Sequence, residues 1–233
     1  MLSDADRQIL MAARLLPSAG NIFMGVGSPL VVGLVAKRRS PGLSAHVEAA
    51  MIGLNPQRGF GTIGDAGLVE GAENLISITE FFNYWLKKVE YSCAIMRALE
   101  VDERGTLNTC RTSSATLGGI GGAVAGAQCA STAVVLTSVG HISLVQQTRH
   151  PTHPLGDICK GDGKTVHVVT ENAVFTRTAS ESNFKCSALA LHGLNQDQIF
   201  QAWSPNSIGD VPVCEFSEAE IADLKTVRLL FDV

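Results

Sequence analysis

The segment from residue 21 to Glu48 constrains the fold most strongly, because it predicts a strand, a turn, a helix and a second strand in succession. The first strand runs into a glycine turn, Gly25-Val26-Gly27-Ser28-Pro29. Ser28 is expected to cap the helix that follows, with Pro29 in its first turn. That helix carries apolar residues at helical spacing, namely Leu30, Val31, Leu34 and Val35. Pro41-Gly42 ends it, so the pattern predicts a βαβ unit of a parallel sheet.

Glu48 stands where the second strand of this unit is expected to end. Residues 43–47 are mostly apolar, whereas Gly53 and Asn55-Pro56 are residues that end strands. Ligands of open α/β sheets bind beyond the carboxyl ends of the strands, so this carboxylate is a candidate for the functional site. The polar, glycine-rich segment 57–71 is interpreted as a loop beside it.

The first glycine turn has two interpretations. A glycine pair that opens a helix after a strand, with an acid about 20 residues further on, is typical of dinucleotide-binding folds. That fingerprint is incomplete here, because its third glycine falls at Leu30, whose side chain would hold the helix away from the strand. In the other interpretation, Gly25 and Gly27 only allow a tight turn, which is compatible with other ligands.

A second glycine cluster, over residues 118–122, precedes an apolar strand expected at residues 133–137. Glycine occupies four of these five positions, which is more than a turn needs. Exposed N–H groups of such a loop can stabilise developing negative charge on an oxygen or bind a phosphate. A packed or flexible loop without a ligand is the alternative.

Further segments predict a framework of helices and strands. Ser3 is expected to cap a helix whose first turn holds Asp4 and Asp6, and Ser217 is followed three residues on by Glu220, which can complete a capping box. The first of these helices should end at Pro17, and the second should bury Ile221, Leu224 and Val227. Other strands are expected over residues 74–79, 92–99, 165–171, 173–177 and 186–192.

Two more helices and one turn complete the framework. One helix is expected over residues 81–88, with Phe82, Trp85 and Leu86 buried, and another opens at Asn195. Arg104-Gly105 has the chemistry of a turn, and Asp102 and Glu103 beside it are interpreted as solvated turn residues.

Length, charge and cysteine content narrow the possible functions. A chain of 233 residues without a linker or low-complexity run is expected to form a single domain over residues 1–233. A net charge of -4 favours neither nucleic acid nor an anionic membrane as a partner. No apolar run approaches the length of a membrane span, and the acidic start is unlike a signal peptide. Six cysteines without a CxxC motif indicate reduced thiols, so a cytoplasmic location is expected.

The histidines and the common nucleophile motifs do not predict a site. His150 and His153 are three residues apart, but Pro151 and Pro154 prevent the helix on which they could share a metal. His46 and His141 are single histidines beside apolar strands, which indicates structural roles. The sequence contains no GxSxG motif and no cysteine in a recognisable catalytic context.

Four separated stretches resemble, in order and spacing, the β-type subunit of family I CoA-transferases, which include the 3-oxoacid, acetoacetate and glutaconate enzymes. Residues 25–30 resemble Gly-Ile/Val-Gly-x-Pro-Leu, and residues 48–56 resemble Glu-Asn-Gly-x-Leu-Gly-x-Gly-Pro. Residues 119–123 match Gly-x-Gly-Gly-Ala, and residues 170–175 match Thr-Glu/Asp-x-Ala-Val-Phe. The resemblance extends over residues 12–216. It implies an α/β fold with an open, mostly parallel sheet flanked by helices, of the NagB/RpiA/CoA-transferase type.

The resemblance also implies a mechanism. Glu48 would be the nucleophile that attacks an acyl-CoA, carries CoA as a glutamyl thioester and passes it to a carboxylic acid. Backbone N–H groups of the glycine loop would stabilise the oxyanions or bind CoA, and a second turn would line the site; these residues are Gly119, Gly121, Gly122 and Ala123, and Gly25 and Gly27. No metal or cofactor is implied, since CoA is a substrate. An α-type subunit would complete the site in a heterodimer or heterotetramer.

The chain departs from the family pattern close to the expected nucleophile. Ala49 and Ala50 replace an asparagine and a glycine, Ala125 replaces an Asp or Asn, and residues 137–141 lack a Met-Glu-His-type segment. Two other functions therefore stay open: a CoA-thioester hydrolase or ring-opening enzyme with a glutamate base, and a non-catalytic structural subunit. A sugar-phosphate-sensing regulator of the same fold class would need a DNA-binding helix-turn-helix, for which there is no room before residue 21.

Overall fold

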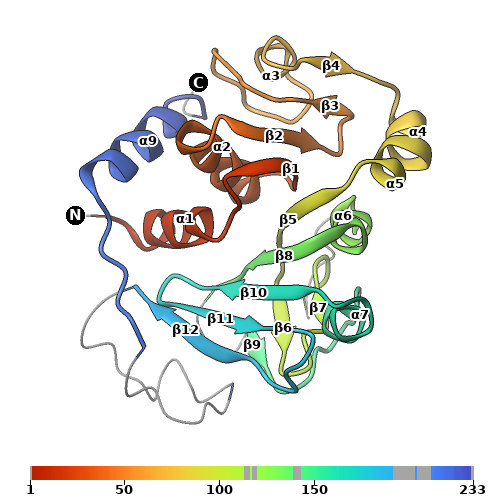
Figure 1. The fold of residues 1–233 in the computed structure, drawn as a ribbon, viewed down its shortest axis with the longest axis vertical. Helices are drawn as coiled ribbons and strands as arrows, with labels where there is room; N and C mark the ends of the chain where they lie inside the picture. Colours follow the sequence, from red (N-terminus) through yellow and green to blue (C-terminus); the bar gives the residue numbers. More distant parts are fainter. Residues whose placement is uncertain are drawn as a thin grey trace.

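A nine-stranded sheet forms the centre of the computed structural model, which describes residues 2–112, 116, 120–138, 143–190, 203 and 211–231 (Figure 1). Its strand order is β12-β11-β10-β8-β5-β1-β2-β3-β4. The strands span Ala19–Met24 (β1), Gly42–Val47 (β2), Met51–Ile52 (β3), Asn74–Leu75 (β4), Tyr91–Arg97 (β5), Ala130–Leu136 (β8), Thr165–Val169 (β10), Ala173–Arg177 (β11) and Lys185–Leu189 (β12). A three-stranded sheet has the order β7-β6-β9, formed by Glu100–Asp102 (β6), Leu107–Asn108 (β7) and Leu144–Val145 (β9).

The five central strands of the large sheet, β10-β8-β5-β1-β2, are parallel, and both edges are antiparallel. Strands β1 and β5 pair with each other in the middle of the sheet. Strands β2, β3 and β4 follow on the β1 side, and β8, β10, β11 and β12 follow on the β5 side. The predicted βαβ unit is confirmed, since β1 and β2 pair in parallel with Met24 opposite Val47. The carboxyl ends of these strands therefore share one edge of the sheet, where the order reverses and ligands bind in such folds.

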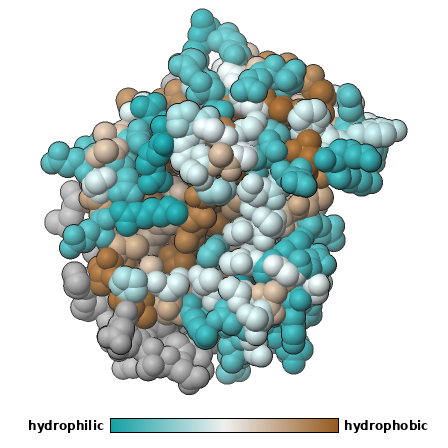
Figure 2. Space-filling model, viewed as in Figure 1, coloured by the Kyte–Doolittle hydropathy of each residue, from teal (hydrophilic) through white to brown (hydrophobic). Residues whose placement is uncertain are grey.

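Helices cover both faces of the sheet. One buried cluster joins the sheet to Asp4–Arg14 (α1), Ser28–Arg39 (α2) and Glu218–Arg228 (α9). The other lies under the helical run of Ile78–Glu80 (α4), Phe81–Trp85 (η1) and Leu86–Lys88 (α5), and under Ala123–Cys129 (α6) and Leu155–Asp162 (α7). Figure 2 shows apolar side chains gathered in the middle of one face, between the positions of α1 and β10 in Figure 1.

Most predicted strands are confirmed, but two segments differ. Over residues 74–79 only the first two residues are strand, because the Ser77 side chain accepts a hydrogen bond from Glu80 N–H and starts a helix. The segment 57–71, interpreted as a loop, contains the short helix Ala66–Val69 (α3). Residues 191 and 192 of the last predicted strand, and the helix expected from Asn195, lie outside the described residues.

The predicted helix ends are partly confirmed. Capping boxes form at Ser3 with Asp6 and at Ser217 with Glu220. The prediction that Ser28 caps α2 is wrong, because Gly27 takes that position in a left-handed conformation (φ 75°) and no side chain bonds the exposed N–H groups.

Three burial predictions also need correction. In the helical run over residues 78–88, Phe81 and Leu86 are buried, whereas Phe82 and Trp85 are only half-buried. In α9, Leu224 and Val227 are buried and Ile221 is half-buried.

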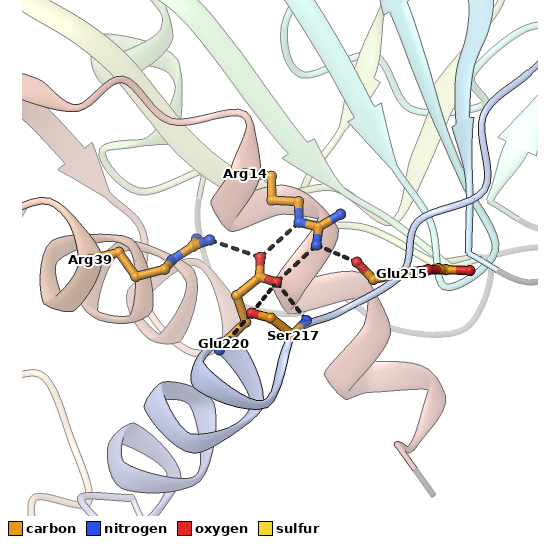
Figure 3. Close-up of polar contacts among 5 residues, drawn as sticks. All are labelled: Arg14, Arg39, Glu215, Ser217 and Glu220. Carbon is orange, nitrogen blue, oxygen red and sulfur yellow. Dashed lines mark hydrogen bonds and ion pairs between the residues drawn. The ribbon is translucent and has the colours of Figure 1, made fainter.

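Glu220 of α9 links this helix to α1 and α2 (Figure 3). Its carboxylate receives hydrogen bonds from Arg14 of α1 at 2.7 and 2.8 Å and from Arg39 of α2 at 2.9 Å. Arg14 also donates to the carbonyl of Glu215. The hydrogen bond with Arg14, together with those from Ser217, lowers the pKa of Glu220 to about 2 although burial opposes the shift. The ion pairs thus fix α9 against α1 and α2.

Replacing Glu220 with glutamine is expected to lower the free energy of unfolding by about 1 to 3 kcal/mol, because both arginines lose a charged partner in a mostly buried position. Glu218→Gln, in the exposed first turn of the same helix, serves as the control and should change stability by about 0.5 kcal/mol or less. Urea unfolding at pH 7 measures both variants. Equal effects of the two substitutions would contradict the role of Glu220.

Candidate active site

Glu48 lies at the carboxyl edge of the sheet, in the three-residue loop that joins β2 to β3. The loop is closed by the N–H of Ala50, which donates to the carbonyl of Val47 at 3.0 Å. The carbonyl of Ala50 accepts from the N–H of Ile76 at 3.2 Å, so the neighbouring chain also holds the turn. The prediction that the strand stops at Glu48 is confirmed, and the half-buried carboxylate is presented from a hairpin tip.

Ala50 has a left-handed backbone conformation (φ 62°), which no other non-glycine residue adopts in the described part of the chain. Three-residue hairpin loops commonly end in such a residue, and glycine is favoured there because a Cβ atom costs about 1 to 2 kcal/mol. The methyl group of Ala50 is fully buried in the core under α6. Alanine at this position therefore strains the turn.

The glycine loop before α6 reaches the carboxylate directly. The N–H of Gly122 donates a hydrogen bond to Glu48 Oε2. A Cβ atom would lie 2.7 Å from this oxygen if built at Gly122 and 3.2 Å from it if built at Gly121. Such a close approach at Gly122 requires a residue without a side chain. The structure therefore brings together Glu48, Gly121 and Gly122, although these residues are more than 70 positions apart in the sequence.

The other predicted site residues lie after β1, at the starts of α2 and α6, or outside the described residues. Gly25 follows the end of β1, and its N–H donates to the carbonyl of Ile95 at 2.9 Å. Gly27 is the N-cap of α2, and a Cβ atom there would have no neighbour within 4 Å. Ala123 is the half-buried first residue of α6. Gly119 lies outside the described residues. The assignment of these residues to a CoA site stays a prediction.

A buried polar network underlies the hairpin, and sequence reasoning predicted only its histidine. His46 Nε2 is 2.9 Å from Ser44 Oγ, and its Nδ1 is 2.7 Å from Tyr91 Oη and 3.4 Å from Trp85 Nε1. Because an indole N–H can only donate, Nδ1 is an acceptor and the proton resides on Nε2. Burial, with a smaller effect of the Lys37 charge, lowers the pKa of His46 to about 4. The histidine is therefore neutral and structural, as its apolar surroundings predicted.

Phe23 is a further residue that the sequence did not single out. Its ring lies between β1 and α6, where a Cβ atom on Gly126 would approach its Cδ1 to 2.3 Å. Gly122 and Gly126 are four residues apart, so both lie on one face of the helix. This spacing was the sequence feature that could have predicted the close approach of α6 to Phe23. Helix α6 can approach the sheet at this point because both positions lack side chains.

Asp102 corrects a sequence prediction, because it is buried and not a solvated turn residue. Its carboxylate accepts backbone hydrogen bonds from Arg104 and Thr106 at 3.0 and 2.9 Å, and from Thr148 at 3.2 Å. It therefore fixes the turn between β6 and β7.

Other features of the described residues are separate from Glu48. A cavity of about 970 Å³ opens beside the C-terminal ends of α2 and α9, near Pro41 at the start of β2, whereas Glu48 follows the end of that strand. Within the described ranges, no three His, Cys, Asp or Glu side chains are arranged to hold a metal ion. The described helices include none of the length and apolarity that crossing a membrane requires.

Several solved structures share this fold. Among solved structures, glutaconate coenzyme A-transferase of Acidaminococcus fermentans matches with a TM-score of 0.81 and 17% identity, covering 99% of this chain and 95% of that chain. The decarboxylase AibA/AibB matches at 0.76 and 16%, covering 97% and 94%. The acyl-CoA transferase YdiF of Escherichia coli matches at 0.71 and 18%, covering 100% of this chain and 45% of that chain. The predicted NagB/RpiA/CoA-transferase-like fold is thereby confirmed.

The sequence is similar to a CoA-transferase subunit. The chain is 25% identical over 214 residues to the B subunit of 3-oxoadipate CoA-transferase of Pseudomonas knackmussii, an alignment that covers 85% of this chain and 82% of that protein. No protein-family model matches the chain. The resemblance to a β-type CoA-transferase chain, predicted from four motifs, is thus confirmed.

Acidification is expected to destabilise the protein through His46. Its folded pKa of about 4 lies below the unfolded value of about 6.5, so the unfolded chain binds more protons between these pH values. The resulting stability is complete above pH 6.5 and is lost as the pH falls toward 4. From pH 7 to pH 5 the loss through His46 should be on the order of 1 to 2 kcal/mol.

Urea unfolding of the wild type and His46→Gln at pH 7 and pH 5 measures this loss. The stability difference between the two proteins should shrink by that amount at the lower pH. His167, whose pKa burial also lowers to about 4, should act in the same direction. An unchanged difference between wild type and His46→Gln would contradict the prediction.

Proposed function

We propose that this chain is the β-type subunit of a CoA-transferase, with Glu48 as the nucleophile. One observation carries the proposal: the half-buried Glu48 carboxylate receives the N–H of Gly122 at the carboxyl edge of the sheet. A fixed N–H donor at a carboxylate that reacts through its own carbonyl carbon can stabilise the oxyanion formed there. The likeness in sequence to the B subunit of 3-oxoadipate CoA-transferase supports the same function.

In the proposed reaction, a Glu48 oxygen attacks the carbonyl carbon of an acyl-CoA and displaces the CoA thiolate, leaving an acyl-glutamyl anhydride. The thiolate then attacks the glutamyl carbonyl carbon and displaces the acyl group as a carboxylate, leaving a glutamyl-CoA thioester. A second carboxylate repeats these steps in reverse and departs as a new acyl-CoA. Covalent catalysis divides one difficult exchange into easier steps and conserves the thioester.

The glycine loop has a defined part in this sequence. When the thiolate attacks Glu48, the glutamyl oxygen becomes an oxyanion, and the N–H of Gly122 already points at one carboxylate oxygen. Gly121 lies beside the same oxygen, and its left-handed conformation (φ 62°) gives the loop its course. The turn of Gly25 and Gly27 would form the opposite wall, and Gly119 and Ala123 would extend the CoA contact.

The proposal includes a partner and a location. An α-type subunit would complete the site in a heterodimer or heterotetramer, in line with the designation of the relative as a B subunit. In YdiF, a fold like that of this chain makes up 45% of one longer chain. No cofactor is required, because CoA is a substrate. All six cysteines are unpaired, which supports a cytoplasmic location.

A second function has specific support. The structural likeness to the decarboxylase AibA/AibB shows that this fold also performs chemistry without CoA transfer. The loss of polar groups at Ala49 and Ala50 fits a glutamate that acts as a base in a CoA-thioester hydrolase or ring-opening enzyme. A non-catalytic subunit would instead be indifferent to Glu48. The transferase, the hydrolase or ring-opening enzyme and the non-catalytic subunit differ in whether they need an acceptor acid and in whether Glu48 forms a covalent CoA adduct.

Intact-protein mass spectrometry of the chain, co-expressed with its α-type subunit, tests the nucleophile. After incubation with a panel of acyl-CoAs, we expect a CoA adduct on this chain that disappears when a carboxylic acid is added. Glu48→Gln, of equal size, should form no adduct. CoA release without an acceptor and without an adduct would favour the hydrolase, and no turnover with any donor would favour the structural subunit.

Gly122→Ala tests the N–H donor. The new methyl group would displace the carboxylate from Gly122, so the rate of adduct formation should fall by about 100-fold or more. Gly64→Ala is the matched control, because its added methyl meets no atom within 4 Å. Thermal unfolding verifies that both variants fold. A folded Gly122→Ala enzyme with a rate within about threefold of the wild type would exclude the proposed role.

A further inference from the structure

The ring of Phe23 lies at the contact between the central sheet and the first turn of α6. Phe23 is on β1 and is 1% exposed. A Cβ atom built on Gly126 would lie 2.3 Å from its Cδ1, and one built on Gly122 would lie 3.1 Å from its Cζ. The N–H of Gly126 donates to the carbonyl of Gly122 at 2.9 Å, which closes the turn between them. One edge of the ring therefore runs along this turn and sets its distance from the sheet.

The same turn carries the hydrogen bond to Glu48. The N–H of Gly122 donates to Glu48 Oε2. A Cβ atom built on Gly122 would lie 3.0 Å from Glu48 Cβ and 3.1 Å from Phe23 Cζ, so both side chains pack on the same side of this glycine. A shift of the helix toward or away from the sheet would therefore change the position of the N–H group relative to the carboxylate.

Two further aromatic residues hold the Phe23 ring in place. Phe81 is tilted against it at a centroid distance of 6.2 Å, and Tyr91 meets it edge-on, at 80° and 6.3 Å. Contacts of this kind favour one orientation of a buried ring. The hydroxyl of Tyr91 is also 2.7 Å from Nδ1 of His46, two residues before Glu48. Phe23 thus connects the helix turn on one side of the carboxylate with the strand that leads to it on the other.

We propose that Phe23 is a positioning residue, whose ring sets the distance between the Gly122 N–H and the Glu48 carboxylate for the reaction at that carboxylate. The inference rests on the function proposed above for Glu48. A donor that stabilises an oxyanion must be in place before the reaction, and a displacement of about 1 Å can lower a rate by about 100-fold. The spacing acts on the oxyanion and not on the bound CoA, so its loss should lower the rate of the chemical step at unchanged affinity.

The rate of CoA adduct formation on Glu48 tests this role in the complete enzyme with its α-type subunit. Intact-protein mass spectrometry of quenched samples gives the limiting rate and the half-saturating concentration of the donor. The donor is the most reactive of acetyl-CoA, butyryl-CoA, acetoacetyl-CoA and succinyl-CoA. Phe23→Leu removes the Cζ end of the ring. It should lower the limiting rate by at least about fivefold and leave the half-saturating concentration within about twofold of the wild type.

Phe60→Leu is the matched control. Phe60 is 4% exposed and packs on Phe231 in the other buried cluster, away from β1 and α6. The substitution makes the same truncation of a buried ring, and both kinetic constants should stay within about twofold of the wild type because the two sites are independent. Thermal unfolding verifies that each variant folds.

Gly126→Ala changes the same contact from the side of the helix. Its methyl group would meet the Phe23 ring at 2.3 Å, push α6 away from the sheet and lower the limiting rate, whereas the smaller side chain of Phe23→Leu gives it room. In the double variant the limiting rate should therefore exceed the product of the two single effects by at least about threefold. Gly126→Ala also tests the spacing if Phe23→Leu fails to fold.

Four results would overturn the inference while Glu48-dependent adduct formation persists. These are a smaller loss of limiting rate in folded Phe23→Leu, a loss confined to a higher half-saturating concentration, an unchanged limiting rate in Gly126→Ala, and fully multiplicative losses in the double variant. If no donor forms an adduct that is absent from Glu48→Gln, the proposed function fails and this inference fails with it. Glu48→Gln assayed beside the wild type therefore distinguishes the two failures.

Discussion

The approach of helix α6 to the sheet is the constraint on which the candidate site depends. Side chains at Gly122 and Gly126 would collide with Glu48 and with the ring of Phe23, so the helix can lie against β1 only with glycine at both positions. The same approach aims the Gly122 N–H at the carboxylate. The lack of a side chain at Gly122 therefore serves both packing and the candidate chemistry. It allows the close contact, and the same residue provides the hydrogen-bond donor.

The carboxylate is held from the other side by a hairpin that has little freedom. The N–H and carbonyl of Ala50 are both bonded, its methyl group is buried, and the histidine two residues before Glu48 is fixed by Ser44 and Tyr91. The strain of a left-handed alanine is of the order of 1 kcal/mol and is outweighed by these contacts. The site is thus built on a short turn between two strands and on a helix start, which position side chains more accurately than free loops.

Local signals predicted the parts of this structure that local interactions determine. The helix cap at Ser3 and the capping box at Ser217 formed as expected, because each joins residues three positions apart. The end of β2 just before Glu48 followed from apolar residues succeeded by residues that end strands. By contrast, Ala50 adopts a conformation that alanine disfavours, and the burial of Asp102 depends on Thr148, 46 residues further on. The contact of Glu48 with Gly122 was expected only from family likeness, because no local pattern predicts pairings across such separations.

The two edge strands of the large sheet, β4 and β12, influence whether the protein aggregates at high concentration. An exposed edge strand offers unpaired N–H and carbonyl groups to another chain, and long, flat edges promote aggregation. Here the outermost strand on the Glu48 side, β4, has only two residues and leads at once into the helical run from Ile78. At the opposite edge, β12 is bonded on its outer side, where the N–H of Cys214 donates to the carbonyl of Leu189. The sheet therefore offers only a two-residue strand at the β4 edge, and the last residue of β12 is already paired at the other edge.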